Sequence, residues 1–135
     1  MPANSFFDTS ILLYAVAQDD RRTPVAEELL ARGGCISVQV LNELVAVARR
    51  KLAMSWKEIL EITAAIRELC EPPLPLSLAS HDAALLIAQR YKFHIYDSLV
   101  VAAALEAGCT VLYTEDLQDG RTIESLRIRN PFRKL

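Results

Sequence analysis

The stretch that decides the fold is Ser5-Phe6-Phe7-Asp8-Thr9-Ser10-Ile11-Leu12. Its first three residues form a short and mostly apolar run, which is typical of a buried strand. The strand ends at Asp8 and two hydroxyl residues, and apolar residues with helical spacing then run from Ile11 to Ala17. A strand that passes at once into a helix favours an alternating α/β fold.

Start and stop residues mark the helices that follow. Thr23-Pro24 predicts a helix with Thr23 as its N-cap, and Gly33-Gly34 ends that helix. Ser55 and Glu58 have the spacing of a capping box, which predicts another helix start. The remaining helices are predicted over Gln39–Lys51, from Ser80 to Tyr91, and from Asp97 to Ala107.

Further strands are predicted at Cys35–Val38, Leu76–Leu78 and Thr110–Tyr113, with Leu126–Arg129 as an edge strand. Strands separated by helices favour a parallel sheet, because such crossovers are right-handed and need a connecting helix. The strands are too hydrophobic to leave a face exposed. We therefore predict one α/β domain over residues 1–135, with a mostly parallel sheet of about four or five strands flanked by helices on both faces.

The length and composition of the chain agree with a single globular domain, and its net charge limits what it can bind. The chain has 135 residues, of which 52% are apolar and 24% charged, so one globular domain with its own core is expected. The net charge is −2, which removes any bulk attraction to nucleic acid. A phosphate-binding protein of this net charge must therefore separate its charges in space, which is compatible with a local basic rim.

The cysteines and the apolar runs bear on location. Cys35, Cys70 and Cys109 are odd in number and widely spaced, so they form neither a disulfide framework nor a zinc motif. Buried free thiols suit a reducing cytosol. The first residues lack a signal-peptide pattern, and Leu99 to Leu105 is too short to cross a bilayer. We expect a cytoplasmic protein with no membrane partner.

Four acidic residues carry the predicted chemistry. Asp8 and Asp116 follow predicted strands, where parallel sheets bind ligands, while Asp97 begins a helix and Glu43 borders an apolar helix face. Carboxylates that share one crevice repel each other, and a hard divalent cation such as Mg²⁺ or Mn²⁺ relieves that repulsion. Each acid also has a simpler interpretation: Asp8 or Asp97 as an N-cap, Glu43 as a solvated residue, Asp116 as a turn residue.

Four short segments along the chain form a recognisable set. They are Phe7-Asp8-Thr9-Ser10-Ile11-Leu12, Asn42-Glu43-Leu44, Tyr96-Asp97-Ser98-Leu99 through Ala104, and Leu112-Tyr113-Thr114-Glu115-Asp116-Leu117. Together they resemble the signatures of PIN-domain ribonucleases, and the group that they resemble most is the VapC-like toxins of bacterial toxin–antitoxin pairs. The segments occur in the family's order, and the resemblance covers nearly the whole chain.

The resemblance implies a function and a set of site residues. It implies a metal-dependent endoribonuclease that cuts RNA with metal-activated water, forms a homodimer, and is blocked by the C-terminal segment of a cognate antitoxin. The implied metal ligands, for one or two Mg²⁺ or Mn²⁺ ions, are Asp8, Glu43, Asp97 and Asp116. The implied supporting hydroxyls are those of Thr9, Ser10 and Thr114.

Some features leave alternatives open. Leu117-Gln118-Asp119-Gly120 departs from the many relatives that have an aromatic residue there, and Asp119 either joins the acids or forms an Asp-Gly turn, which we favour. Basic clusters at Arg21-Arg22, Arg49–Lys51 and the tail could be an RNA footprint or a solvated surface. The alternative function is a protein-interaction module on the same fold that performs no chemistry.

Overall fold

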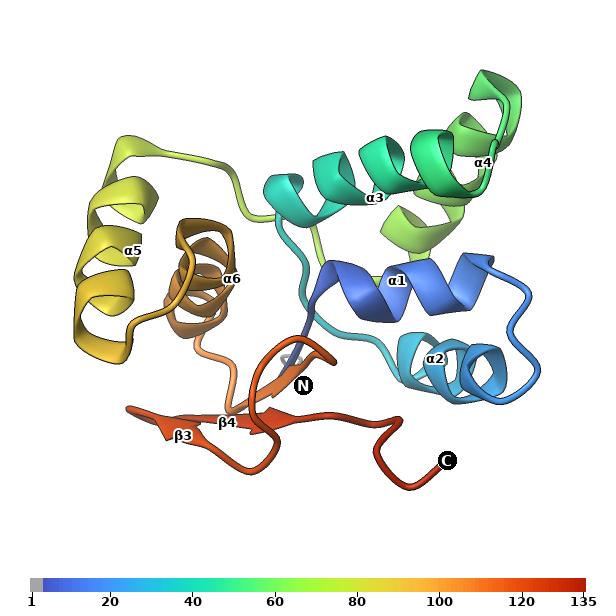
Figure 1. Ribbon diagram of the computed structural model, residues 1–135. Helices are drawn as coiled ribbons and strands as arrows, with labels where there is room; N and C mark the ends of the chain where they lie inside the picture. Colours follow the sequence, from blue (N-terminus) through green and yellow to red (C-terminus); the bar gives the residue numbers. More distant parts are fainter. Residues whose placement is uncertain (1–3) are drawn as a thin grey trace.

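The computed structural model describes residues 4–135, and within that range six helices lie in the chain between the first two strands of the sheet (Figure 1). The elements in chain order are β1 (Ser5–Phe7), α1 (Thr9–Val16), α2 (Arg22–Ala31), α3 (Val38–Lys51), α4 (Trp56–Leu69), α5 (Leu78–Tyr91), α6 (Ile95–Glu106), β2 (Val111–Tyr113), β3 (Thr122–Ile123) and β4 (Leu126–Arg129).

The sheet is mostly parallel, as the sequence predicts. Its strand order is β1-β2-β4-β3, and β1, β2 and β4 run parallel while β3 is antiparallel to β4. The prediction that Leu126–Arg129 is an edge strand is wrong, because the two-residue strand β3 pairs on its outer side. The register pairs Phe7 with Tyr113, so the residues that follow β1 and β2 emerge side by side.

Two predicted strands are absent from the described chain. Cys35 and Ser37 form only isolated parallel bridges, to Phe6 and Leu74 respectively, so Cys35–Val38 is not a strand. The reason is that Ser37 caps α3 by accepting a hydrogen bond from the Val40 amide, which turns the backbone into the helix. The prediction of a strand at Leu76–Leu78 is wrong for the same reason, since Ser77 caps α5 by accepting a hydrogen bond from the Ser80 amide.

The predicted helix starts are partly wrong. The capping box of α4 is confirmed, with Ser55 accepting from the Glu58 amide and the Glu58 carboxylate accepting from the Ser55 amide. The α2 helix begins earlier, at Arg22, because the Thr23 hydroxyl instead donates to the Tyr14 and Ala17 carbonyls of the preceding turn. The last two helices also begin before the predicted residues, at Leu78 rather than Ser80 and at Ile95 rather than Asp97.

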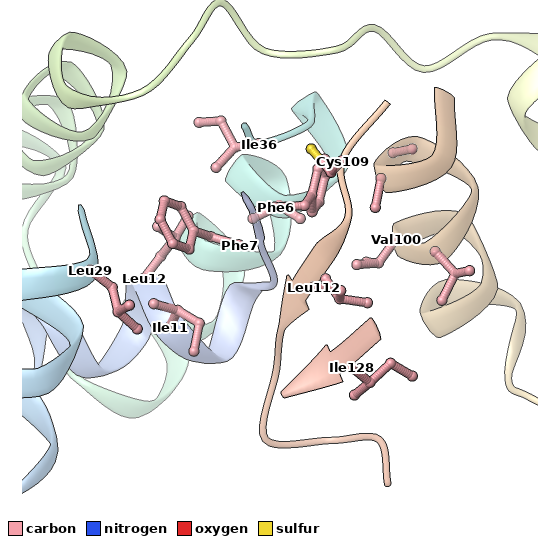
Figure 2. Packing of buried hydrophobic residues seen from close by; sticks show 14 of the residues in the cluster. Phe6, Phe7, Ile11, Leu12, Leu29, Ile36, Val100, Cys109, Leu112 and Ile128 are labelled. Carbon is pink, nitrogen blue, oxygen red and sulfur yellow. The ribbon is translucent and has the colours of Figure 1, made fainter. Parts of the chain in front are cut away.

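Helices cover both faces of the sheet, as predicted. The pair α5 and α6 stands on one side, and α1 to α4 gather on the other (Figure 1). Figure 2 shows Phe7, Ile11 and Leu29 on one side of β2, with Val100 of α6 on the other. All four side chains are buried in the same hydrophobic cluster, so the two faces share one continuous core.

The backbone of β1 is closely approached by the segment that leads into α3. The Cys35 amide donates to the Ser5 carbonyl at 2.8 Å, and the Phe7 amide donates to the Cys35 carbonyl at 3.0 Å. A side chain at Gly34 would put its Cβ 2.5 Å from Cε2 of Phe7, so only glycine fits here.

The cysteines are free thiols as the sequence predicts, but only Cys109 is buried, while Cys35 and Cys70 are partly exposed. Cys35, Cys70 and Cys109 are free thiols, and burial raises the pKa of Cys70 to about 11 and that of Cys109 to about 12. These two thiols therefore stay protonated near neutral pH. Within residues 4–135, no helix is both long and apolar enough to span a membrane.

Candidate active site

Asp8 lies at the carboxyl end of β1, where the chain turns into α1. It is the N-cap of that helix, and its Oδ1 accepts a hydrogen bond of 2.7 Å from the Thr9 amide. Its Oδ2 accepts a 2.6 Å hydrogen bond from the Thr114 hydroxyl, which follows β2. Only 4% of Asp8 is exposed, so this carboxyl is fixed in position and largely removed from water.

Burial dominates the protonation of Asp8. Desolvation raises its pKa from 3.8 to about 7, the hydrogen bond from Thr114 acts against the rise, and the nearby Asp116 carboxylate adds to it. Near neutral pH, Asp8 is therefore poised between its charged and neutral forms. A cation brought next to it would favour the charged form.

Thr114 links two of the predicted acids. While its hydroxyl donates to Asp8, the same oxygen accepts a 3.0 Å hydrogen bond from the Asp116 amide. The pairing of β1 with β2 makes this possible, since the Asp8 amide also donates to the Tyr113 carbonyl at 3.0 Å. The parallel register thus brings the first and last of the resembling segments into direct contact.

Glu43 reaches the same region from α3. Its Oε2 accepts a 2.9 Å hydrogen bond from the Thr9 hydroxyl, and its Oε1 accepts a 3.1 Å hydrogen bond from Nε2 of Gln39. The Gln39 Nε2 also donates to the carbonyl of Tyr96 in α6, at 3.1 Å. Gln39 therefore connects the helix that carries Glu43 to the helix that carries Asp97.

Asp97 lies in the first turn of α6 and is partly exposed. Burial raises its pKa most, the Asp116 carboxylate adds to the rise, His94 acts against it, and Glu43 contributes a smaller increase. The carboxylates of two other predicted site acids, Asp116 and Glu43, thus raise the pKa of Asp97. The structure brings all four acids into one electrostatic group, with Asp8 buried and Asp116 exposed.

The remaining predicted hydroxyl, that of Ser10, holds the loop after β2. Its Oγ accepts a 3.2 Å hydrogen bond from the Glu115 amide. The carboxylate of Glu115 is bound elsewhere, because it accepts a 2.9 Å hydrogen bond from the Tyr14 hydroxyl and lies 3.5 Å from Nε of Arg22. Ser10 therefore acts on the site through the backbone of this loop.

Asp119 does not join the acids. Its Oδ1 accepts a 2.8 Å hydrogen bond from the Asn130 amide, and its Oδ2 accepts one of 2.9 Å from Arg133. Asp119 and Gly120 form a turn in which Gly120 has a φ of 83°, as the Asp-Gly pair predicts. The carboxylate of Asp119 therefore holds the C-terminal segment.

A groove of about 410 Å³ opens beside two of the acids, Glu43 and Asp116. Its other lining residues are partly polar and partly apolar: Thr9, Ser10, Leu13, Tyr14, Ala17, Val47, Lys51, Leu52 and Glu115. A groove of this size with mixed walls can hold a small molecule or a short part of a larger ligand.

The donor chemistry of the site fits a hard cation. Carboxylate oxygens are the ligands that Mg²⁺ and Mn²⁺ prefer, and the mutual repulsion of these acids is the kind that such an ion relieves. In addition, the buried Oε1 of Gln39 has no hydrogen-bond partner among the described residues. Over the same range, no group of three or more His, Cys, Asp or Glu side chains has an arrangement that could hold a metal ion.

These features define an α/β protein with an acidic site at the carboxyl ends of parallel strands. The PIN-domain family model matches residues 5–119, and the chain belongs to the PIN-domain family. That range includes all four acids and the three supporting hydroxyl residues. No curated protein sequence matches the chain.

Solved structures of bacterial toxins share the fold. A toxin–antitoxin complex from Klebsiella pneumoniae is similar with a TM-score of 0.73 at 18% identity, covering 95% of this chain and 98% of that one. VapBC2 from Rickettsia felis, bound to a DNA fragment from its promoter, gives 0.67 at 19% identity, covering 93% and 97%. The Mycobacterium tuberculosis toxin VapC20, which cleaves the sarcin–ricin loop, gives 0.66 at 20%, covering 83% and 91%. The predicted resemblance to VapC-like PIN proteins is thus confirmed at the level of the fold.

Proposed function

We propose that the protein is an Mg²⁺- or Mn²⁺-dependent endoribonuclease and the toxin of a toxin–antitoxin pair. The observation that carries the proposal is the contact between Asp8 and Thr114, which joins the ends of β1 and β2 and brings Asp116 beside Asp8. A buried carboxyl with a raised pKa and further acids around it is an expensive arrangement for structure alone. It is the arrangement that a cation-binding nuclease needs.

Each site residue has a proposed role. Asp8, Glu43, Asp97 and Asp116 hold one or two divalent ions through their carboxylate oxygens. Such an ion supplies a Lewis acid for the phosphodiester and lowers the pKa of a water molecule. The supporting residues keep the carboxylates in place: Thr114 fixes Asp8, Thr9 fixes Glu43, and Ser10 fixes the loop that carries Asp116.

RNA is the proposed substrate, in structured or looped form such as transfer or ribosomal RNA, and the cytoplasm is the proposed location. Support for RNA comes from the family and from the sarcin–ricin loop named for the similar VapC20. The groove beside Glu43 and Asp116 is open enough for a chain segment to reach the acids. The similar toxin–antitoxin complexes support a cognate antitoxin as the protein partner.

The exposed apolar side chains favour protein contacts. Leu52, Trp56 and Leu60 lie near the Lys51 end of α3 and on α4, with Trp56 59% and Leu60 70% exposed. On α5, Leu78 is 75% and Leu86 69% exposed. We propose that these two surfaces, on different sides of the molecule (Figure 1), serve the antitoxin and a second copy of the chain.

The test is cleavage of total RNA and transfer RNA by the purified protein with Mg²⁺ or Mn²⁺, and with EDTA instead. Asp8→Asn should abolish the metal-dependent cleavage, because it removes one carboxylate charge while keeping the shape of the side chain. Asp82→Asn, which removes an exposed charge on α5, is the matched control and should cut like the wild type. Full activity of Asp8→Asn would contradict the proposal. A wild-type protein that neither cuts RNA nor binds metal would favour the interaction module.

A further inference from the structure

A cluster of aromatic and basic side chains lies where α5 ends. The rings of Tyr91 and Phe93 are stacked, with centroids 5.8 Å apart and an interplanar angle of 21°. The guanidinium carbon of Arg121 lies 5.4 Å from the Tyr91 centroid and 5.0 Å from the Phe93 centroid. Arg90 covers Tyr91 as well, at 5.4 Å. We call Arg90, Tyr91, Lys92, Phe93 and Arg121 the Arg–aromatic platform.

The positive charges of the platform are not neutralised by acids. Within the part of the chain that the structure describes, Arg90, Lys92 and Arg121 form no ion pair, whereas Arg22 and Arg133 each pair with a carboxylate. Arg90 and Lys92 are exposed, and Arg121 is partly exposed. In a protein of net charge −2, three unpaired cations around two rings make a distinct local surface for an anion.

Both segments of the platform lead directly to site acids. Phe93 is followed by His94, whose charge acts on the pKa of Asp97. Arg121 ends the loop that carries Asp116, and its carbonyl accepts a 2.8 Å hydrogen bond from the Ile128 amide, which ties it to β4. The platform is therefore connected to Asp97 and Asp116 through short chain segments.

We propose that the Arg–aromatic platform binds a single-stranded segment of the RNA substrate next to the cleavage site, an inference that rests on the proposed function. The acids repel phosphates, so the affinity for RNA has to come from cations outside the acidic group. Guanidinium and ammonium groups bind phosphates, while aromatic rings and guanidinium planes stack on unpaired bases. An acidic peptide would match the charges of the platform and would leave its planar surfaces unused.

The experiment measures binding of a labelled oligouridylate and of a labelled RNA hairpin by fluorescence anisotropy in EDTA, at several salt concentrations. Arg90→Gln and Arg121→Gln should each reduce the slope of log K against log salt by about 0.7 for the single strand, the value of one lost phosphate contact. Phe93→Leu should weaken binding at least about fivefold with little change in slope. Arg67→Gln, on exposed α4 surface, is the charge-matched control and should bind like the wild type.

The outcomes separate this inference from the proposed nuclease. If the wild-type protein binds RNA through the platform but does not cleave it in the presence of metal, the proposed nuclease activity is wrong. The proposed RNA-binding role of the platform then still holds. If the protein cleaves RNA but the platform variants bind RNA like the wild type, only the proposed role of the platform is wrong. Equal binding of a polyglutamate peptide would also overturn it, as would no RNA binding by the wild type. Arg90 is exposed, so Arg90→Gln tests the platform even if Arg121→Gln melts at a lower temperature.

Discussion

Asp8 serves two purposes with its two oxygens. The sequence leaves open whether it is an N-cap or a site acid. The structure confirms the N-cap, with Oδ1 accepting from the Thr9 amide, and Oδ2 accepts from the Thr114 hydroxyl. The cap fixes the rotation of the carboxyl, and Thr114 fixes its second oxygen. A residue that begins a helix is thereby held in the fixed orientation that the proposed metal site needs.

Thr114→Val should lower metal-dependent cleavage by about tenfold or more, the usual effect of removing a partner of a metal ligand. The substitution keeps the side-chain shape and removes both the donor to Asp8 and the acceptor for the Asp116 amide. Cleavage rates of the wild type and of Thr114→Val, measured over a range of Mg²⁺ concentrations, test this prediction. Thr110→Val, an exposed change just before β2, should leave the rate unaltered, and equal rates in all three proteins would contradict the argument.

The pH dependence of stability should report the burial of Asp8 in metal-free protein. Its folded pKa of about 7 lies above the ordinary value of 3.8, so folding favours the protonated form. The stabilising effect is complete below about pH 4 and is lost as the pH rises through about 7. In EDTA, the melting temperature of the wild type should fall over this window relative to Asp8→Asn, by at least about 3 °C.

Asparagine is a sound comparison because it caps helices as well as aspartate and does not ionise. The gap between the two proteins should narrow when Mg²⁺ is added at pH 8, since a cation offsets the charge of Asp8. If the difference in melting temperature between the wild type and Asp8→Asn stays constant from pH 4 to pH 8, the Asp8 carboxyl is not desolvated as it is in the structure.

The sequence predicts which acids the fold brings together better than it predicts their hydrogen-bond partners. Asp8 and Asp116 are found because each follows a strand, and strand ends of a parallel sheet share one edge. Gln39 is missed, although it precedes Glu43 by one helical turn, because its contact with Tyr96 joins helices far apart in the chain. The direction of Glu115 is likewise set by Tyr14 and Arg22, which no local pattern reveals.

At the scale of elements, short strands are where sequence patterns mislead. Cys35–Val38 and Leu76–Leu78 are apolar enough for strands, yet each contains a serine that caps the next helix. β3 is two residues long, so it carries no periodic signal at all. The longer helices are predicted well, because their apolar stripes and the capping box at Ser55 are local features that do not depend on distant packing.

Ser55→Ala should destabilise the protein by about 1 kcal/mol without reducing the cleavage rate per folded molecule. The change removes the oxygen that accepts from the Glu58 amide and opens the capping box of α4. For a domain of this size, the melting temperature should drop by about 3–5 °C. Ser125→Ala is an exposed control outside the helices. A loss of activity in folded Ser55→Ala would mean that α4 takes part in substrate contact.

Charge is distributed unevenly over the whole molecule. Four acids gather at one edge of the sheet, while several of the remaining charges are paired, as in Arg22 with Asp19 and Arg133 with Asp119. The unpaired cations of the Arg–aromatic platform lie on chain segments that lead to Asp97 and Asp116. The small net charge therefore conceals a molecule that can repel phosphate at one place and attract it at the next.

The C-terminal segment holds this arrangement together. Phe132 is buried and packs edge-on against Tyr14 of α1, with centroids 4.9 Å apart, and Arg133 binds Asp119 in the loop after β2. The segment thus joins α1, whose N-cap is Asp8, to the loop that carries Asp116. Neither residue touches an acid of the site, so the effect of their loss would pass through the fold.

Phe132→Ala should lower the free energy of unfolding by about 3–5 kcal/mol, because it removes a buried ring and leaves a cavity beside Tyr14. Urea unfolding, followed by circular dichroism, measures the change. Leu135→Ala is the control, since that side chain is 47% exposed and should change stability little. Metal-dependent cleavage by folded Phe132→Ala should also fall, because the freed loop holds Asp116 less firmly. Equal stability of the wild type and Phe132→Ala would mean that the segment does not pack against α1 in solution.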